Sequence, residues 1–171
     1  MKTTCTSIAR TLVAATLIIS AFSAGSANAQ QGLVTERSIT VDAAMELATV
    51  SLARCRADGY KVTITVLNRR ARTAVVLSED GVNPHTVENS LRKAYTAFTT
   101  RASTAEMAKR QQPGLSGFLL LENLTNLEGG LPIWAGKELV GAIGISGAPG
   151  GEKDAACAQA GLDKIAKALG N

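Results

Sequence analysis

Apolar residues recur three and four positions apart in several stretches of the chain, a spacing typical of helices with one buried face. Thr40 is a favoured helix cap, and Gly59 is a favoured stop. The pattern therefore predicts a helix from Thr40 to about Asp58. The positions that we expect it to bury are Val41, Met45, Ala48, Leu52 and Cys55.

A second helix is predicted to start near residue 84. Asn83 is a favoured N-cap, and Pro84 suits the first helical position, where its missing N–H costs nothing. At about 100° per residue, His85 lies opposite the apolar stripe. We therefore expect its imidazole to point away from the core. The stripe consists of Val87, Leu91, Ala94 and Phe98, whereas His85 is flanked by Glu88, Asn89, Arg92 and Thr96.

Two hairpins are predicted from alternating and β-branched residues. Residues 60–67 and 73–77 form the first, joined by a turn at 68–72, and residues 131–135 and 138–146 form the second. Glycine inside a strand marks the close approach of a helix, another backbone or a ligand. We expect such an approach at Gly141 and Gly144.

Shorter signals complete the element order. Ser103 and Glu106 have the spacing of a capping box, which predicts a short helix through Arg110. The apolar run at residues 117–121 predicts a short buried strand. An acidic first turn opens a final helix that runs to about residue 169. Helices that are apolar on one face and antiparallel hairpins together predict an α+β fold.

The first 29 residues have the features of a secretory signal peptide. Lys2 and Arg10 are basic, an apolar run at 11–22 is too short to span a bilayer, and Ala27 and Ala29 frame a cleavage site. We expect cleavage after Ala29 and a periplasmic or secreted product. Residues 30–39 are then a flexible lead-in, and residues 40–171 are a single domain.

Composition argues against a nucleic-acid partner. The net charge is only +4, two of the basic residues lie in the signal, and aromatic residues make up 4% of the chain. Cys5 also lies in the signal, which leaves Cys55 and Cys157 as an even pair. In an oxidising compartment they are candidates for a disulfide; the alternative is that both are small buried side chains.

His85 is the only histidine, and it is the candidate for metal chemistry. At the positive end of a helix dipole the neutral imidazole is favoured, and this form can bind a metal through its free lone pair. The alternative is a solvated surface residue. The arginines of the 68–72 turn suit a solvated turn better than a ligand clamp. The glycine-rich segment at 147–151 lacks the motifs of a phosphate loop.

Three stretches of the chain resemble the GlcG/HbpS-type haem-binding family, which also covers the C-terminal domain of PduO-like proteins. The first runs from Asp80 to Ala97. The second combines residues 129–133 with 141–147. The third is residues 148–154, followed by Cys157, Ala158 and residues 160–162. The resemblance implies a central antiparallel sheet of about five strands flanked by helices, in a profilin-like layer arrangement, and assembly into dimers or larger homo-oligomers.

The resemblance also implies a haem site. His85 is then the axial ligand of the iron, with Glu88 or Asn89 orienting the site. Arg92, Lys93 or Arg101 would pair with the haem propionates. Met45, Met107 and Tyr95 are weaker iron ligands by position. Free iron or a corrinoid stays open as the natural partner. The 68–72 turn departs from the acidic, glycine-containing turn of the family, which leaves any function of that turn in doubt.

The sequence therefore predicts an exported haem-binding protein that transports, stores or senses haem rather than a catalyst. One alternative is an enzyme acting on a small organic acid, in which His85 is the general base and Glu88 its partner. The other alternative is a non-catalytic partner of a membrane sensor or transport system.

Overall fold

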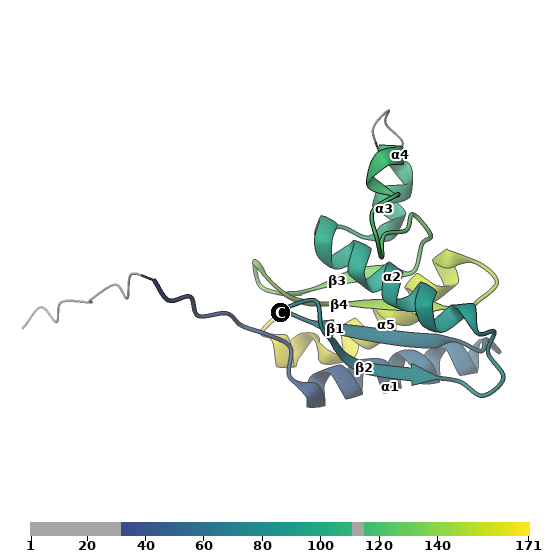
Figure 1. Ribbon diagram of the computed structural model, residues 1–171. Helices are drawn as coiled ribbons and strands as arrows, with labels where there is room; N and C mark the ends of the chain where they lie inside the picture. The colour runs from purple at the N-terminus through teal and green to yellow at the C-terminus, as the bar shows by residue number, and fades with distance from the viewer. Residues whose placement is uncertain (1–31, 111–114) are drawn as a thin grey trace, which may run out of the picture. The chain divides into compact units, whose positions relative to one another are not determined.

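An antiparallel sheet forms the middle layer of the fold. The computed structural model describes residues 32–110 and 115–171, and within them the sheet has four strands in the order β2-β1-β4-β3 (Figure 1). The long strand β4 pairs with β1 on one side and with β3 on the other. The bounds are β1 (Thr63–Asn68), β2 (Thr73–Ser78), β3 (Gly130–Ala135) and β4 (Glu138–Ser146). Both predicted hairpins are confirmed.

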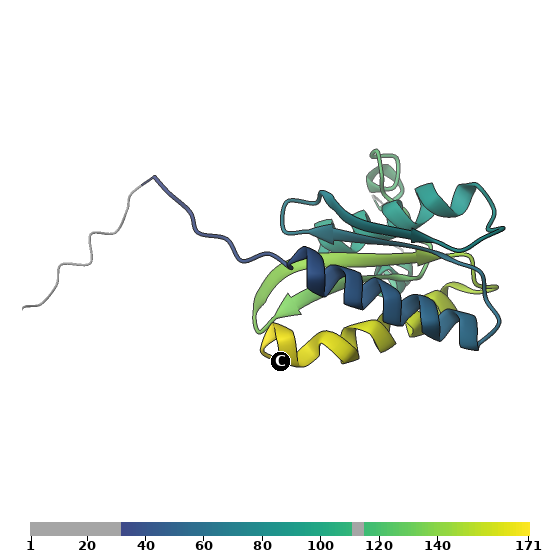
Figure 2. The same cartoon turned by 90° about the horizontal axis from the view of Figure 1, so that it is seen from below.

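Helices α1 (Val41–Ala57) and α5 (Gly151–Leu169) cover one face of the sheet and lie side by side (Figure 2). The Thr40 side chain accepts a hydrogen bond from the Ala43 N–H, which confirms the predicted cap. Cys55 and Cys157 form a disulfide between the two helices, with their Cα atoms 5.5 Å apart. Both cysteines are fully buried, so the bridge lies inside the main core rather than on its surface.

Helix α2 (His85–Thr100) covers the opposite face, where it contacts β1, β4 and β3. A Cβ on Gly144 would lie 2.1 Å from the Ser90 carbonyl oxygen, so only glycine allows the helix to approach β4 this closely. A Cβ on Gly141 would likewise lie 2.4 Å from the Leu67 carbonyl oxygen. The predicted close approach at both glycines is confirmed, and in each case the neighbour is protein backbone.

The buried face of α2 is only partly the predicted one: Ala94 is fully buried, but the face is rotated at the start of the helix. Val87 is 46% exposed, whereas the fully enclosed Ser90 and the nearly enclosed Thr86 face the sheet. Their hydroxyls meet those of Thr65 and Thr63 on β1, each at 2.8 Å. Because β1 presents hydroxyls to the helix, a polar helix face can be buried there with its hydrogen bonds satisfied.

A similar rotation affects α1. Met45, which we expected to be buried, is 43% exposed, and Val41 is 60% exposed. Ala44, Leu47 and Ser51 lie inside instead, together with the expected Ala48, Leu52 and Cys55. Small residues bring α1 close to α5: a Cβ on Gly161 would lie 2.2 Å from the Ser51 hydroxyl.

Two short helices, α3 (Thr104–Lys109) and α4 (Leu115–Phe118), project beyond α2 (Figure 1). The capping box of Ser103 and Glu106 is confirmed. The predicted strand at residues 117–121 is wrong, because α4 and a turn occupy this segment. Within residues 32–110 and 115–171 the sheet therefore has four strands rather than about five.

Only part of the predicted N-terminal region lies among the described residues. The predicted signal peptide, residues 1–29, lies outside the described part of the chain. Ile39, the last residue of the expected lead-in, is 6% exposed, and its N–H donates to the Val140 carbonyl. Among the described residues, none of the helices combines the length and hydropathy that a membrane span requires.

Candidate functional site

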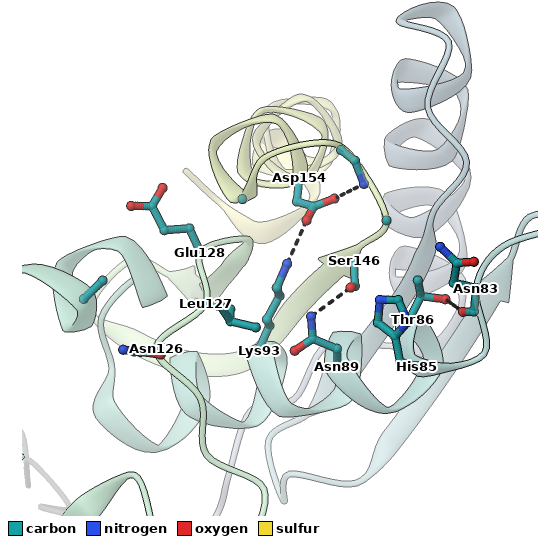
Figure 3. Close-up of a pocket in the computed structure, with 14 residues that line it drawn as sticks. Asn83, His85, Thr86, Asn89, Lys93, Asn126, Leu127, Glu128, Ser146 and Asp154 are labelled. Carbon is teal, nitrogen blue, oxygen red and sulfur yellow. Dashed lines mark hydrogen bonds and ion pairs between the residues drawn. The ribbon is translucent and has the colours of Figure 1, made fainter. Parts of the chain in front are cut away.

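His85 is the first residue of α2, and its side chain is exposed. Pro84 rather than Asn83 is the N-cap; Asn83 contributes its carbonyl oxygen, which accepts from the Thr86 N–H at 3.0 Å. The imidazole lies at the edge of a pocket of about 590 Å³, in which His85 and Asn83 stand on one side and Asn126 and Glu128 on the other (Figure 3).

The pocket is built from segments that are far apart in the sequence. Helix α2 supplies His85, Thr86, Asn89 and Lys93, and the loop before β3 supplies residues 126–128. The end of β4, the loop after it and the start of α5 supply a further wall, with Ser146, Gly147, Ala148, Gly151 and Asp154, and Asn83 and Ala108 of α3 complete the lining. Most of these groups are polar, so the pocket favours a ligand that remains partly in contact with water.

Asn89 lies one turn after His85 on the same face of α2. Its amide nitrogen donates to the Ser146 hydroxyl at 2.9 Å, as Figure 3 shows. This bond connects the first turns of the helix to the end of β4. It therefore fixes the position of the helix surface that carries His85.

Lys93 and Asp154 form a buried ion pair in the pocket. The Lys93 Nζ lies 2.7 Å from Asp154 Oδ2 and donates to the Ile145 carbonyl oxygen at 2.8 Å. Asp154 Oδ1 accepts from the Ala148 N–H at 3.0 Å. Burial raises the pKa of the Asp154 carboxyl above its ordinary value, and the Lys93 charge opposes this rise. The pair joins α2, β4 and α5 at one point.

A shallower hollow of about 370 Å³ lies on the outer side of His85. It is lined by His85, Glu88, Asn89, Arg92 and Leu127. Arg92 donates to the Glu88 carboxylate one turn away on the helix. Leu127 is 54% exposed, so an apolar side chain stands open to solvent beside the imidazole.

The structure brings five of the six predicted site residues together. His85, Glu88, Asn89, Arg92 and Lys93 all line one or both hollows. Arg101 ends α2, sixteen residues after His85, which places it roughly 24 Å along the helix axis. Among the weaker ligand candidates, Met45 lies on α1 across the sheet from α2, and Met107 is buried.

Two features of the site differ in detail from the expectations. Glu88, the partner of His85 in the enzyme alternative, bonds to Arg92. Lys93, expected to meet a propionate, has only 4% of its side chain exposed and holds Asp154. Sequence reasoning missed Asp154 and Ser146 because neither has a local signal that connects it to α2. Among the described residues, no group of three or more His, Cys, Asp and Glu side chains could hold a bare metal ion.

Comparison with known proteins places this site in a family. A family model described as haem degrading protein HbpS-like matches residues 39–163. The chain belongs to the HbpS-like family. The fold and the predicted resemblance are thus confirmed, and the match spans every residue that lines the pocket.

Solved HbpS structures are similar over most of their length. A double mutant of HbpS from Streptomyces reticuli is 30% identical, with a TM-score of 0.75 over 92% of this chain and 99% of its own. A second HbpS structure is 34% identical, with a TM-score of 0.73 over 78% and 94% of the two chains. An uncharacterized 15.0 kDa protein of Citrobacter freundii, from the dhaT-dhaS intergenic region, is 32% identical over 73% of this chain and 90% of its own.

A haem complex of a PduO C-terminal domain shares the fold. Its TM-score is 0.69 at 22% identity, over 75% of this chain and 95% of its own. At this identity the similarity concerns the architecture alone. The same sheet, with helices on both faces, therefore occurs in a protein that binds haem.

Proposed function

We propose that this protein binds haem and that His85 is an axial ligand of the iron. The observation that carries the proposal is the exposed imidazole of His85, between two hollows in a chain of the HbpS-like family. An imidazole nitrogen is a common axial ligand of haem iron. The family description supports haem as the ligand.

The residues around His85 fit a porphyrin better than a bare ion. A porphyrin supplies four nitrogen ligands itself, so one imidazole is sufficient protein ligation. The apolar porphyrin face would cover Leu127, which is otherwise half exposed. Asn89, through its bond to Ser146, holds the helix turn that carries the imidazole in place. When bound, haem would supply a redox-active iron centre.

The site is open, so a bound haem would stay in contact with solvent. This supports a protein that carries, senses or degrades haem. The family description names degradation, whereas the sequence suggested transport or sensing; we keep haem binding as the common element. Free iron or a corrinoid is the alternative ligand. A membrane sensor or transporter is the proposed partner that would receive the signal or the haem.

Export and self-assembly belong to the same proposal. A disulfide between Cys55 and Cys157 suits an oxidising compartment such as the periplasm, which supports export. Val87 and Val76 are exposed apolar side chains on α2 and on the edge strand β2, which supports a homo-oligomer that covers them. Intact-mass analysis of the exported protein and sedimentation analysis would test these two points.

A haem titration tests the ligand assignment. The purified protein and its His85→Ala variant are titrated with ferric haem, and the Soret band is recorded. We expect a saturable band in the wild-type protein and a shifted or lost band in the variant, because the axial nitrogen is gone.

The control is Thr99→Ala, a change at an exposed position near the other end of the same helix. It should leave the spectrum unchanged, and far-UV circular dichroism should show that both variants remain folded. Identical spectra for the wild-type protein and His85→Ala would refute His85 as the ligand.

A further inference from the structure

A third hollow, of about 470 Å³, lies next to the His85 pocket. Its lining includes Tyr60, Lys61 and Pro149, and it shares Asn83, Thr86 and Gly147 with the pocket of Figure 3. The three hollows therefore form a series of neighbours, in which the pocket of Figure 3 shares lining residues with each of the other two. Arg92 lines the outer hollow, His85 lines both the outer hollow and the pocket, and Lys61 lines the third hollow.

One lysine lines the third hollow, and a second lies beside one of its wall residues. The Lys61 ammonium is close enough to Gly81 that a Cβ there would lie 3.3 Å from Nζ, which places the charge at the wall of the hollow. The Lys153 ammonium lies 5.5 Å from the centre of the Tyr60 ring, a second wall residue. Neither lysine takes part in any ion pair among the described residues.

The nearby acidic groups leave this positive charge available. Glu79 is hydrogen-bonded to Arg56, and this bond is the main reason that the pKa of Glu79 lies below its ordinary value; the Lys61 charge contributes less. Asp80 also interacts with Arg56 and contributes to raising the pKa of the Arg56 guanidinium. Near the third hollow, Glu79 and Asp80 therefore interact more strongly with Arg56 than with the two lysines.

The cations expected from the sequence to hold the propionates are engaged or distant. Arg92 bonds to Glu88, Lys93 is buried against Asp154, and Arg101 is at the far end of α2. A carboxylate that approached Arg92 would have to compete with Glu88. Neither Lys61 nor Lys153 forms an ion pair among the described residues, and Glu79, which interacts with the Lys61 charge, is itself bonded to Arg56. Electrostatics thus favours the Lys61 end of the series.

We propose that Lys61 and Lys153 bind the propionate carboxylates of a haem whose iron is held by His85. This assignment rests on the proposed function, because it gives an orientation to the same ligand. The porphyrin would extend from His85 past Asn83 toward Tyr60, with its carboxylates at the third hollow. Charge-assisted hydrogen bonds from the two ammonium groups would fix which edge of the ring enters there.

A comparison of haem with its dimethyl ester separates the binding of the propionates by Lys61 and Lys153 from the ligation of the iron by His85. The ester keeps the iron and the ring but lacks the carboxylate charges. Both ligands are titrated into the wild-type protein and into Lys61→Gln/Lys153→Gln. We expect the wild-type protein to bind haem about tenfold more tightly than the ester, as two partly exposed ion pairs allow. The double variant should bind both ligands equally, with its Soret position unchanged.

The matched control is Lys137→Gln/Lys167→Gln, which removes the same charge from exposed positions elsewhere on the molecule. It should keep the preference for haem, and higher salt should reduce that preference in the wild-type protein. Preserved discrimination in Lys61→Gln/Lys153→Gln, or its loss in Arg92→Gln alone, would overturn this assignment while leaving His85 as the ligand. A wild-type protein that caused no saturable change in the Soret band of either compound would overturn both proposals.

Discussion

Lys93 and Asp154 are the residues on which the geometry of the pocket depends most. Removing one member of a buried ion pair leaves the other charge without compensation, which typically costs about 3–5 kcal/mol. Here the group left without its partner would be Asp154, whose carboxylate also accepts from the Ala148 N–H in the loop before α5. The cost should therefore depend on whether that carboxylate can take up a proton.

We expect Lys93→Met to destabilise the fold by about 3–5 kcal/mol near neutral pH and by less in acid. Burial already raises the folded-state pKa of Asp154, and removing Lys93 takes away the charge that lowers it. A pKa that is higher in the folded than in the unfolded state means that stability is retained below the unfolded value and lost as the pH rises through the folded value. Urea unfolding from pH 5 to pH 8 measures this slope.

The control for this pH dependence is Lys93→Met/Asp154→Asn. The amide can still accept from Ala148, but it does not titrate, so the added slope should disappear and part of the stability should return. If Lys93→Met had the same stability deficit at every pH, the buried carboxylate would not be the source of the cost.

At the level of elements, the disulfide joins α1 to the turn of α5 that carries Asp154. Cys157 follows Asp154 by three residues, and the bridge spans 102 positions of sequence. It therefore restrains the unfolded chain strongly and holds the first turns of α5 against α1 in the folded protein.

Replacing both cysteines by alanine should lower the free energy of unfolding by up to about 4–5 kcal/mol, the chain-entropy estimate for a loop of about 100 residues. Denaturant unfolding of the oxidised wild-type protein and the Cys55→Ala/Cys157→Ala variant measures the difference. A loss below about 1 kcal/mol would contradict this entropic account of the bridge.

Elements with local signals were predictable from the sequence. The Thr40 cap, the Ser103–Glu106 capping box and the turn at Gly136 each lie where the pattern placed them. The structure of the apolar run at residues 117–121 was not predictable, because a run this short suits a strand and a helix equally well. The element order was recovered, apart from that one strand.

The buried faces of the helices and the pairing of residues in the site could not be predicted from single elements, because both depend on which elements pack together. The amphipathic pattern of α2 pointed to Val87, but the hydroxyls of β1 select Thr86 and Ser90 for the buried side. Lys93 and Asp154 are 61 residues apart, and their pairing follows from the topology. His85 is exposed as the pattern predicted, although Lys93 and Thr96, which lie about two to three turns further along the same side of the helix, are buried.

On the scale of the whole molecule, the proposed site is a series of hollows built where α2, the end of β4 and the start of α5 meet. Gly144 lets α2 lie close to the sheet, the Lys93–Asp154 pair holds α5 to both, and the disulfide connects α5 to α1. The packed layers thus support one exposed imidazole at a fixed place. The account depends on that imidazole reaching the iron.

The most direct measurement is imidazole rescue of His85→Gly. The variant is mixed with ferric haem, free imidazole is added, and the Soret band is compared with that of the wild-type complex. The account predicts that the band is altered in the variant and returns to its wild-type position as imidazole fills the space left by the side chain. A variant whose spectrum matches the wild type before imidazole is added would contradict it.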